Sequence, residues 1–185
     1  HVLGDLLIRY IAGELNANIK AVIANHDHLK DLVEKFNIPF TCISADGLSR
    51  EEHEDKMIAK INEYEPELIV LAKYMRILTP KFVEVFPKKV LNIHHSFLPA
   101  FIGANPYKQA HERGVKIIGA TAHYVTNDLD EGPIIFQDVV RVDHSYSWED
   151  MRNAGRNVEK IVLSNAFEML LNDRVFVHGN KTVIL

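Results

Sequence analysis

The sequence Leu68-Ile69-Val70-Leu71-Ala72 is a continuous apolar run that begins two residues after Pro66. A short apolar run bounded by turn residues predicts a strand that is buried on both faces of its sheet. The segment before Pro66 has apolar residues at helical spacing, and Ser49 with Glu52 three positions later predicts a capping box at its start. A helix is therefore expected to lead into a buried strand.

The same alternation extends on both sides of this run. We expect further strands at residues 19–24, 40–43, 89–93, 117–125 and 134–142, and further helices at residues 3–11, 29–36, 80–85 and 105–113 and from residue 147 onward. Short apolar runs on either side of Gly179-Asn180 predict a C-terminal β-hairpin. This pattern predicts an α/β fold with a mostly parallel twisted sheet, helices on both faces and a Rossmann-like organisation.

The two ends of this pattern carry further expectations. The chain begins with a helix, whereas an α/β domain normally opens with a central strand, so we expect one domain over residues 1–185 whose first strand is missing upstream. The last helix should bury the face formed by Met151, Ala154, Val158, Ile161 and Asn165 or Phe167.

Composition excludes several classes of protein. Of the 185 residues, 47% are hydrophobic and 25% are charged, which is ordinary for a globular domain. The net charge of −4 argues against nucleic acid as a partner, and no apolar run approaches the roughly 20 residues of a membrane span. The single cysteine, Cys42, cannot form an internal disulfide, so we expect a cytoplasmic protein in which Cys42 is a buried strand residue.

The densest polar cluster lies at the end of the strand predicted over residues 89–93. Asn92 and His94 are two positions apart, so on a strand both side chains point to the same face. An amide can donate a hydrogen bond to a developing oxyanion, and an imidazole can move protons near neutral pH. This pairing indicates acyl-group chemistry at a strand end.

Such a site needs a carboxylate to orient the imidazole. The loop between the two long strands offers three acids, Asp128, Asp130 and Glu131, followed by a turn at Gly132-Pro133. The residue pattern alone does not select among these acids, and each could instead brace the loop.

The two segments together resemble the folate-dependent formyltransferase and hydrolase family. The resemblance rests on Asn-Ile-His at residues 92–94, followed by Ser96, Leu98-Pro99 and Gly103, and on the Leu-Asp-Glu-Gly-Pro loop at residues 129–133. It covers essentially the whole chain and implies a formyltransferase fold. It also implies that Asn92, His94 and Asp130 are the catalytic residues.

Two details resemble the formyltetrahydrofolate deformylase branch of that family. His95 stands where glycinamide ribonucleotide formyltransferases usually have proline, and Leu3-Gly4-Asp5 stands in place of their Gly-Ser-Asn phosphate loop. An acid there would repel a substrate phosphate. The implied reaction is hydrolysis of 10-formyltetrahydrofolate to tetrahydrofolate and formate, in support of one-carbon balance and purine biosynthesis. Glycinamide ribonucleotide formyl transfer from the same donor is the alternative.

The resemblance also implies a folate-binding wall after the strand at residues 68–72 and near the acidic loop. The implied substrate-binding residues are Met75, Arg76, Ile77, Leu78, Ser96, Gly103, His123, Val125, Thr126 and Asp128. His123 could equally be a core-packing residue. A direct catalytic role for His95 is expected less than a role outside catalysis.

The remaining expectations concern partners. We expect no cofactor and no metal, with folate and water as the small-molecule partners and neither nucleic acid nor membrane. A zinc site built from His94, His95, His123 and Asp130 is a possible alternative, as is a folate-binding module without turnover. The resemblance further implies a homo-oligomer and an upstream ACT-type regulatory domain in the complete protein.

Overall fold

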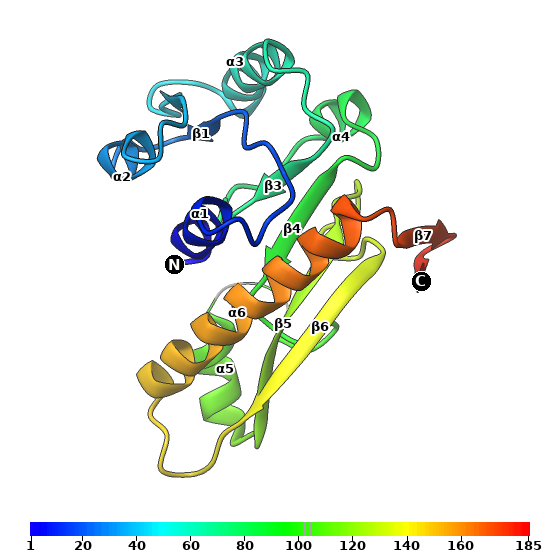
Figure 1. Ribbon diagram of the computed structural model, residues 1–185. Coiled ribbons are helices and arrows are strands. Elements are labelled where there is room, and N and C mark those ends of the chain that lie inside the picture. The colour runs from blue at the N-terminus through cyan, green and yellow to red at the C-terminus, as the bar shows by residue number, and fades with distance from the viewer. Residues whose placement is uncertain (102, 104) are drawn as a thin grey trace.

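A computed structural model of the protein describes residues 1–101, 103 and 105–185. Its elements alternate between helices and strands up to β5, as the sequence predicts (Figure 1). They are α1 (Val2–Ile11), β1 (Val22–Ala24), α2 (Lys30–Glu34), β2 (Phe40–Cys42), α3 (Arg50–Asn62), β3 (Ile69–Leu71), α4 (Pro80–Val85), β4 (Val90–His94), α5 (Pro106–Arg113), β5 (Ile117–Tyr124), β6 (Ile134–Arg141), α6 (Trp148–Leu171), β7 (Val175–His178) and β8 (Lys181–Ile184).

β1 and β2 form a two-stranded parallel sheet, and the central sheet is mixed, with four strands in the order β3-β4-β5-β6. β1 pairs with β2 and β3 pairs with β4 in parallel, whereas β5 runs antiparallel to both β4 and β6. The short connection at residues 125–133 contains no crossover helix, so β6 must return antiparallel to β5. The α/β class, the helix-covered sheet and the C-terminal hairpin of β7 and β8 are confirmed.

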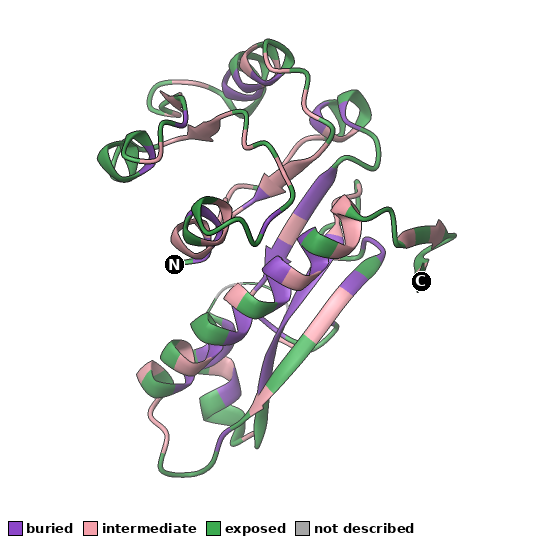
Figure 2. Ribbon diagram, in the orientation of Figure 1, coloured by how far each residue is buried: buried purple, intermediate pink, exposed green. Residues whose placement is uncertain are grey.

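Helix α6 supplies most of the core that covers this sheet. It lies along β4, β5 and β6, and its apolar face meets the small side chains of Ala120 and Ala122 on β5 (Figure 1). Burial is concentrated on β4, β5 and this helix face (Figure 2). The capping box predicted at the start of α3 is present, and Ser147 with Asp150 forms a second one at the start of α6. Among the residues that the structure describes, no helix is long and apolar enough to cross a membrane.

Two burial predictions are wrong. Ile161 is 45% exposed, because the buried stripe of α6 runs through Val158, Val162 and Ala166 at four-residue spacing and leaves position 161 on the outer side. Cys42 is exposed at the last position of β2, where it pairs with Ala24 of β1.

Candidate active site

The central strand β4 carries two of the predicted catalytic residues. Asn92 pairs with Leu71 of β3 on one side and with His123 of β5 on the other, so it lies inside the sheet and not at an edge. His94 is the last residue of the strand and is buried. Both side chains lie on the same face of the sheet, as the two-residue spacing predicts.

The third residue comes from the loop between β5 and β6. Asp130 has a left-handed backbone with φ 57°, which is uncommon for a residue with a side chain. Pro133 accepts a hydrogen bond from the Tyr124 N–H at 3.0 Å, which closes the base of this loop. Gly132 is required here, since a Cβ at that position would lie 1.8 Å from the Tyr124 carbonyl oxygen.

This loop brings the Asp130 carboxylate against two imidazoles. Oδ2 lies 3.2 Å from His94 Nδ1, and Oδ1 lies 3.6 Å from His123 Nε2. Burial alone would raise the pKa of Asp130, but the neighbouring imidazoles of His123 and His94 outweigh it and hold that pKa well below its usual range. The carboxylate is therefore ionised throughout the neutral pH range.

The carboxylate fixes which nitrogen of His94 can react. A carboxylate only accepts hydrogen bonds, so His94 Nδ1–H donates to Asp130 and the lone pair of the neutral ring lies on Nε2. Among the described residues, His94 Nε2 is buried and has no hydrogen-bond partner. This nitrogen is thus available to take a proton from a bound molecule.

His123 orients the Asn92 amide. Its Nδ1 lies 2.9 Å from the Tyr124 carbonyl oxygen, which can only accept, so Nδ1 carries the hydrogen. In the neutral ring, Nε2 accepts from Asn92 Nδ2 at 3.3 Å, and in the protonated ring its hydrogen faces Asp130 Oδ1 at 3.6 Å. The amide retains a second N–H, which can donate to an oxyanion. The structure therefore places His123 beside Asn92 and Asp130. From the sequence, a role in the substrate pocket and a role in core packing were equally expected.

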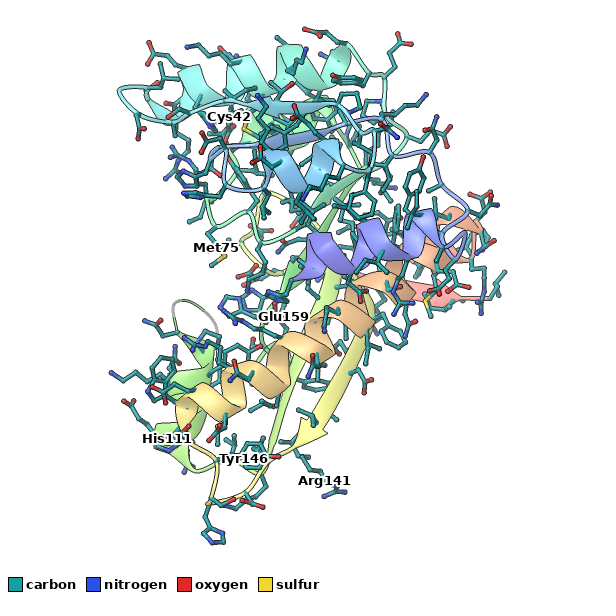
Figure 3. All side chains as sticks on the ribbon, turned by 60° about the vertical axis from the view of Figure 1, so that its left-hand side comes forward. Cys42, Met75, His111, Arg141, Tyr146 and Glu159 are labelled. Carbon is teal, nitrogen blue, oxygen red and sulfur yellow. The ribbon has the colours of Figure 1, made fainter. Side chains whose placement is uncertain are left out.

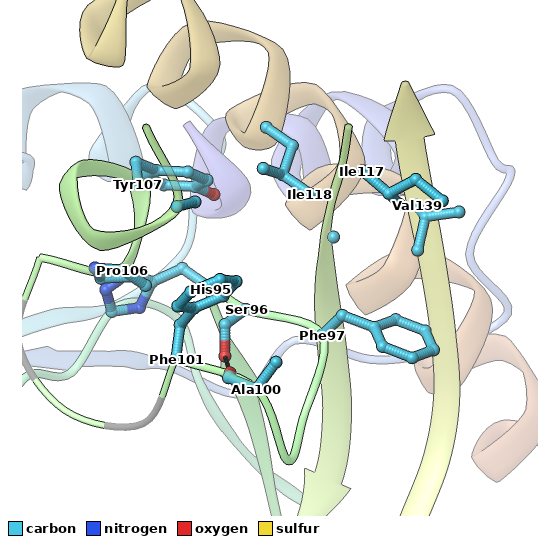
Figure 4. Close-up of a pocket in the computed structure, with 12 residues that line it drawn as sticks. His95, Ser96, Phe97, Ala100, Phe101, Pro106, Tyr107, Ile117, Ile118 and Val139 are labelled. Carbon is cyan, nitrogen blue, oxygen red and sulfur yellow. Dashed lines mark hydrogen bonds between the residues drawn. The ribbon is translucent and has the colours of Figure 1, made fainter. Parts of the chain in front are cut away.

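The loop after β4 is held by a buried threonine. Thr121 Oγ1 donates to the Ser96 carbonyl at 2.9 Å and accepts from the Leu98 N–H at 3.0 Å. The Ser96 hydroxyl donates to the Ala100 carbonyl at 2.7 Å, which Figure 4 shows as a dashed line. Ser96, predicted to bind substrate, is thus committed to the loop backbone. Gly103 follows in the same loop with φ 95°.

The predicted folate wall divides into an exposed and a packed part. Met75 and Ile77 are 70% and 49% exposed after β3, and Figure 3 shows Met75 projecting at the edge of the molecule. Leu78 and Val125 instead pack around one apolar cluster. Arg76 lies between Met75 and Ile77 in the same segment, and Thr126 Oγ1 donates to the Asp128 carbonyl at 3.2 Å.

Two cavities adjoin the end of β4. The first, about 390 Å³, lies between α5, β5 and the loop after β4 (Figure 4), and the second, about 630 Å³, lies between α1, α5 and α6. His95, Pro106 and Tyr107 line both. Within the described part of the chain, no group of three or more His, Cys, Asp or Glu residues could hold a metal ion.

Sequence reasoning missed a buried charged cluster beside the second cavity. Glu159 of α6 is fully buried, and its carboxylate contacts Tyr107 Oη at 2.7 Å, Lys73 Nζ at 3.2 Å and His1 Nε2 at 2.8 Å. The sequence feature that could have predicted this cluster is an acid next to Val158 on the apolar face of a capped helix. A charge buried there requires partners.

A family model described as formyl transferase matches residues 1–167. Formyltetrahydrofolate deformylases from Escherichia coli (strain K12) and Bacillus subtilis (strain 168) are 63% and 54% identical to the chain over its whole length. The chain spans 66% and 61% of their lengths, which is less than two thirds of each.

Solved structures agree with this match. The chain superposes over its whole length on 62% of a formyltetrahydrofolate deformylase from Pseudomonas syringae pv. tomato, with a TM-score of 0.97 and 48% identity. A glycinamide ribonucleotide transformylase from Symbiobacterium toebii has a TM-score of 0.93 and 30% identity, with 99% of this chain and 88% of that chain covered.

Fold and site together define an α/β domain in which an amide, an imidazole and a carboxylate converge at the end of a central strand. The chain belongs to the formyl transferase family. The resemblance drawn from residues 92–103 and 129–133 is thereby confirmed.

Proposed function

We propose that the protein hydrolyses 10-formyltetrahydrofolate to tetrahydrofolate and formate. The observation that carries this proposal is the unpartnered Nε2 of His94, held by Asp130 beside the Asn92 amide. The choice of water as acceptor is supported by the relatives named formyltetrahydrofolate deformylase, which are 50–64% identical to this chain. The glycinamide ribonucleotide transformylase structure is 30% identical.

Each step of the reaction has a group in the site. Water attacks the formyl carbon while His94 Nε2 takes one of its protons, and the carbonyl oxygen becomes an oxyanion that accepts from the Asn92 amide. The carbon–nitrogen bond then breaks, and His94 returns the proton to the departing folate nitrogen. The products are tetrahydrofolate and formic acid, which ionises to formate. Asp130 stabilises the imidazolium form between these two transfers.

The folate itself would bind along the exposed wall at Met75 and Ile77. These apolar side chains are uncovered in the structure, and a pterin ring laid on them would remove their surface from water. The reaction as written needs no metal and no cofactor. A homo-oligomer, a cytoplasmic location and an upstream regulatory domain are further proposals that rest on the family resemblance.

The test is formate release by the intact protein. The protein is incubated with 10-formyltetrahydrofolate in water, with and without glycinamide ribonucleotide, and formate and formylated amine are both measured. The proposal predicts formate at the same rate in both reactions. Formyl transfer that depends strictly on the amine would instead establish the transformylase alternative.

A further inference from the structure

A row of aromatic rings leads away from His94 on β4. The ring centroids of His94 and His95 lie 5.2 Å apart, and those of His95 and Tyr107 lie 6.0 Å apart. Both distances are within the range of aromatic pairing. His95 therefore lies between the proposed proton-transfer group and a tyrosine of α5. It lines both cavities, the first of which is drawn in Figure 4.

The far end of this row is firmly anchored. Tyr107 Oη donates to the buried Glu159 carboxylate at 2.7 Å, and Lys73 approaches the same carboxylate at 3.2 Å. Burial, reinforced by Glu159, raises the pKa of Tyr107, so the hydroxyl stays protonated and remains a donor. Gly155 of α6 makes this packing possible, since a Cβ there would lie 2.2 Å from the Tyr107 hydroxyl oxygen.

An attacking water needs more than one polar partner, because ordered water typically makes two to four hydrogen bonds. Both oxygens of Asp130 already face imidazoles, and His94 Nε2 supplies one partner for the water. His95 is the adjacent group, half-buried, with ring contacts but no hydrogen bond to any other described residue.

We propose that His95 holds the attacking water beside His94, and that Tyr107, anchored on Glu159, sets the position of the His95 ring. This inference rests on the proposed hydrolysis and assigns the residue that makes water the acceptor. His95 is then in contact with the nucleophile, whereas Tyr107 and Glu159 are positioning residues.

The charges around His95 suit this role. Burial first, then Lys73 and His94, lower the pKa of His95 to about 4, against the opposing effect of Glu159 and Asp130. A neutral imidazole has one donor and one acceptor nitrogen. At neutral pH, His95 can therefore either accept a hydrogen bond from the water or donate one to the water oxygen.

The experiment compares two acceptors in the same reaction. Wild type, His95→Phe, His95→Gln and Tyr107→Phe are given 10-formyltetrahydrofolate with added hydroxylamine, and formate and formohydroxamate are quantified together. Hydroxylamine supplies its own nucleophilic nitrogen, loses a proton as water does, and does not require a group that holds water. His111→Phe, on the exposed face of α5, is the matched control.

We expect His95→Phe to lower kcat for formate release by at least about tenfold, with KM for the folate within about twofold. The ratio of formohydroxamate to formate should rise several-fold in His95→Phe. His95→Gln should retain part of the water reaction. Tyr107→Phe should raise the same ratio by less than His95→Phe does. An equal loss of both products, or an unchanged kcat in His95→Phe, would overturn the inference. Absence of formate from wild type would instead refute the proposed function.

Discussion

His94 Nδ1 lies 3.2 Å from Asp130 Oδ2, and this contact joins the end of the central strand β4 to the loop between β5 and β6. It leaves Nε2 of the same ring buried and unpartnered among the described residues. Asp130 has a left-handed backbone conformation in this loop. The proton-transfer capacity of His94 therefore depends on a backbone geometry that lies outside the strand itself.

Replacement of Asp130 by asparagine should remove the charge and keep the size of the side chain. An amide can present its NH₂ group to His94 Nδ1, which favours the tautomer with hydrogen on the wrong nitrogen. We expect kcat for formate release to fall by at least roughly 10²-fold. Steady-state kinetics at saturating folate measures this, and turnover close to wild type would exclude Asp130 from the catalytic set.

Asn92→Ala should act mainly on the transition state. The second amide N–H is proposed to contact the oxyanion, and loss of such a donor typically lowers kcat by about 10²- to 10³-fold. Folate KM should change little, because the amide does not line the exposed wall at Met75 and Ile77. If KM rises while kcat is preserved, Asn92 is a binding residue.

Gly132→Ala should disrupt the loop that carries Asp130. A Cβ at this position would meet the Tyr124 carbonyl oxygen at 1.8 Å, so the backbone has to move. We expect a loss of stability of about 1–3 kcal/mol, as for other strained substitutions, together with loss of activity. Denaturant unfolding measures the first effect. The matched control is Gly4→Ala in α1, where no atom lies within 4 Å and helix propensity favours alanine.

His95 should make the folded state sensitive to mild acid. Its pKa is about 4 in the folded protein, against about 6.5 for an unperturbed histidine. Between these values the unfolded chain binds more protons, so stability falls as pH drops from 6.5 toward 4. The difference in unfolding free energy between pH 7 and pH 5 should therefore be smaller in His95→Gln than in wild type. An equal difference in the two proteins would contradict the assignment.

The strand pairings and the site differ in how much of them could be predicted from the sequence. Apolar runs located the strands, and the two-residue spacing of Asn92 and His94 placed both on one face, because side-chain direction alternates along any strand. Asp130 could be distinguished from Asp128 only through the family resemblance. Its selection depends on a left-handed loop conformation that leaves no periodic signal in the sequence.

Other features depended on contacts between distant segments. Glu159 is isolated in an apolar helix face, and only the fold shows that Lys73 and Tyr107 reach its carboxylate. Burial of Ile161 was predicted wrongly because helical spacing fits two adjacent stripes of α6. Packing against β5 selects the stripe that leaves Ile161 exposed.

The central claim is that water is the formyl acceptor, and the oxygen of the product tests it most directly. The intact protein is incubated with 10-formyltetrahydrofolate in H₂¹⁸O without any amine, and the formate is analysed by mass spectrometry within the first turnovers. The account predicts one solvent-derived oxygen in each formate, with release at least roughly 10²-fold slower in Asp130→Asn. Formate that carries no ¹⁸O, or no formate at all with a formylated product only when an amine is added, would contradict it.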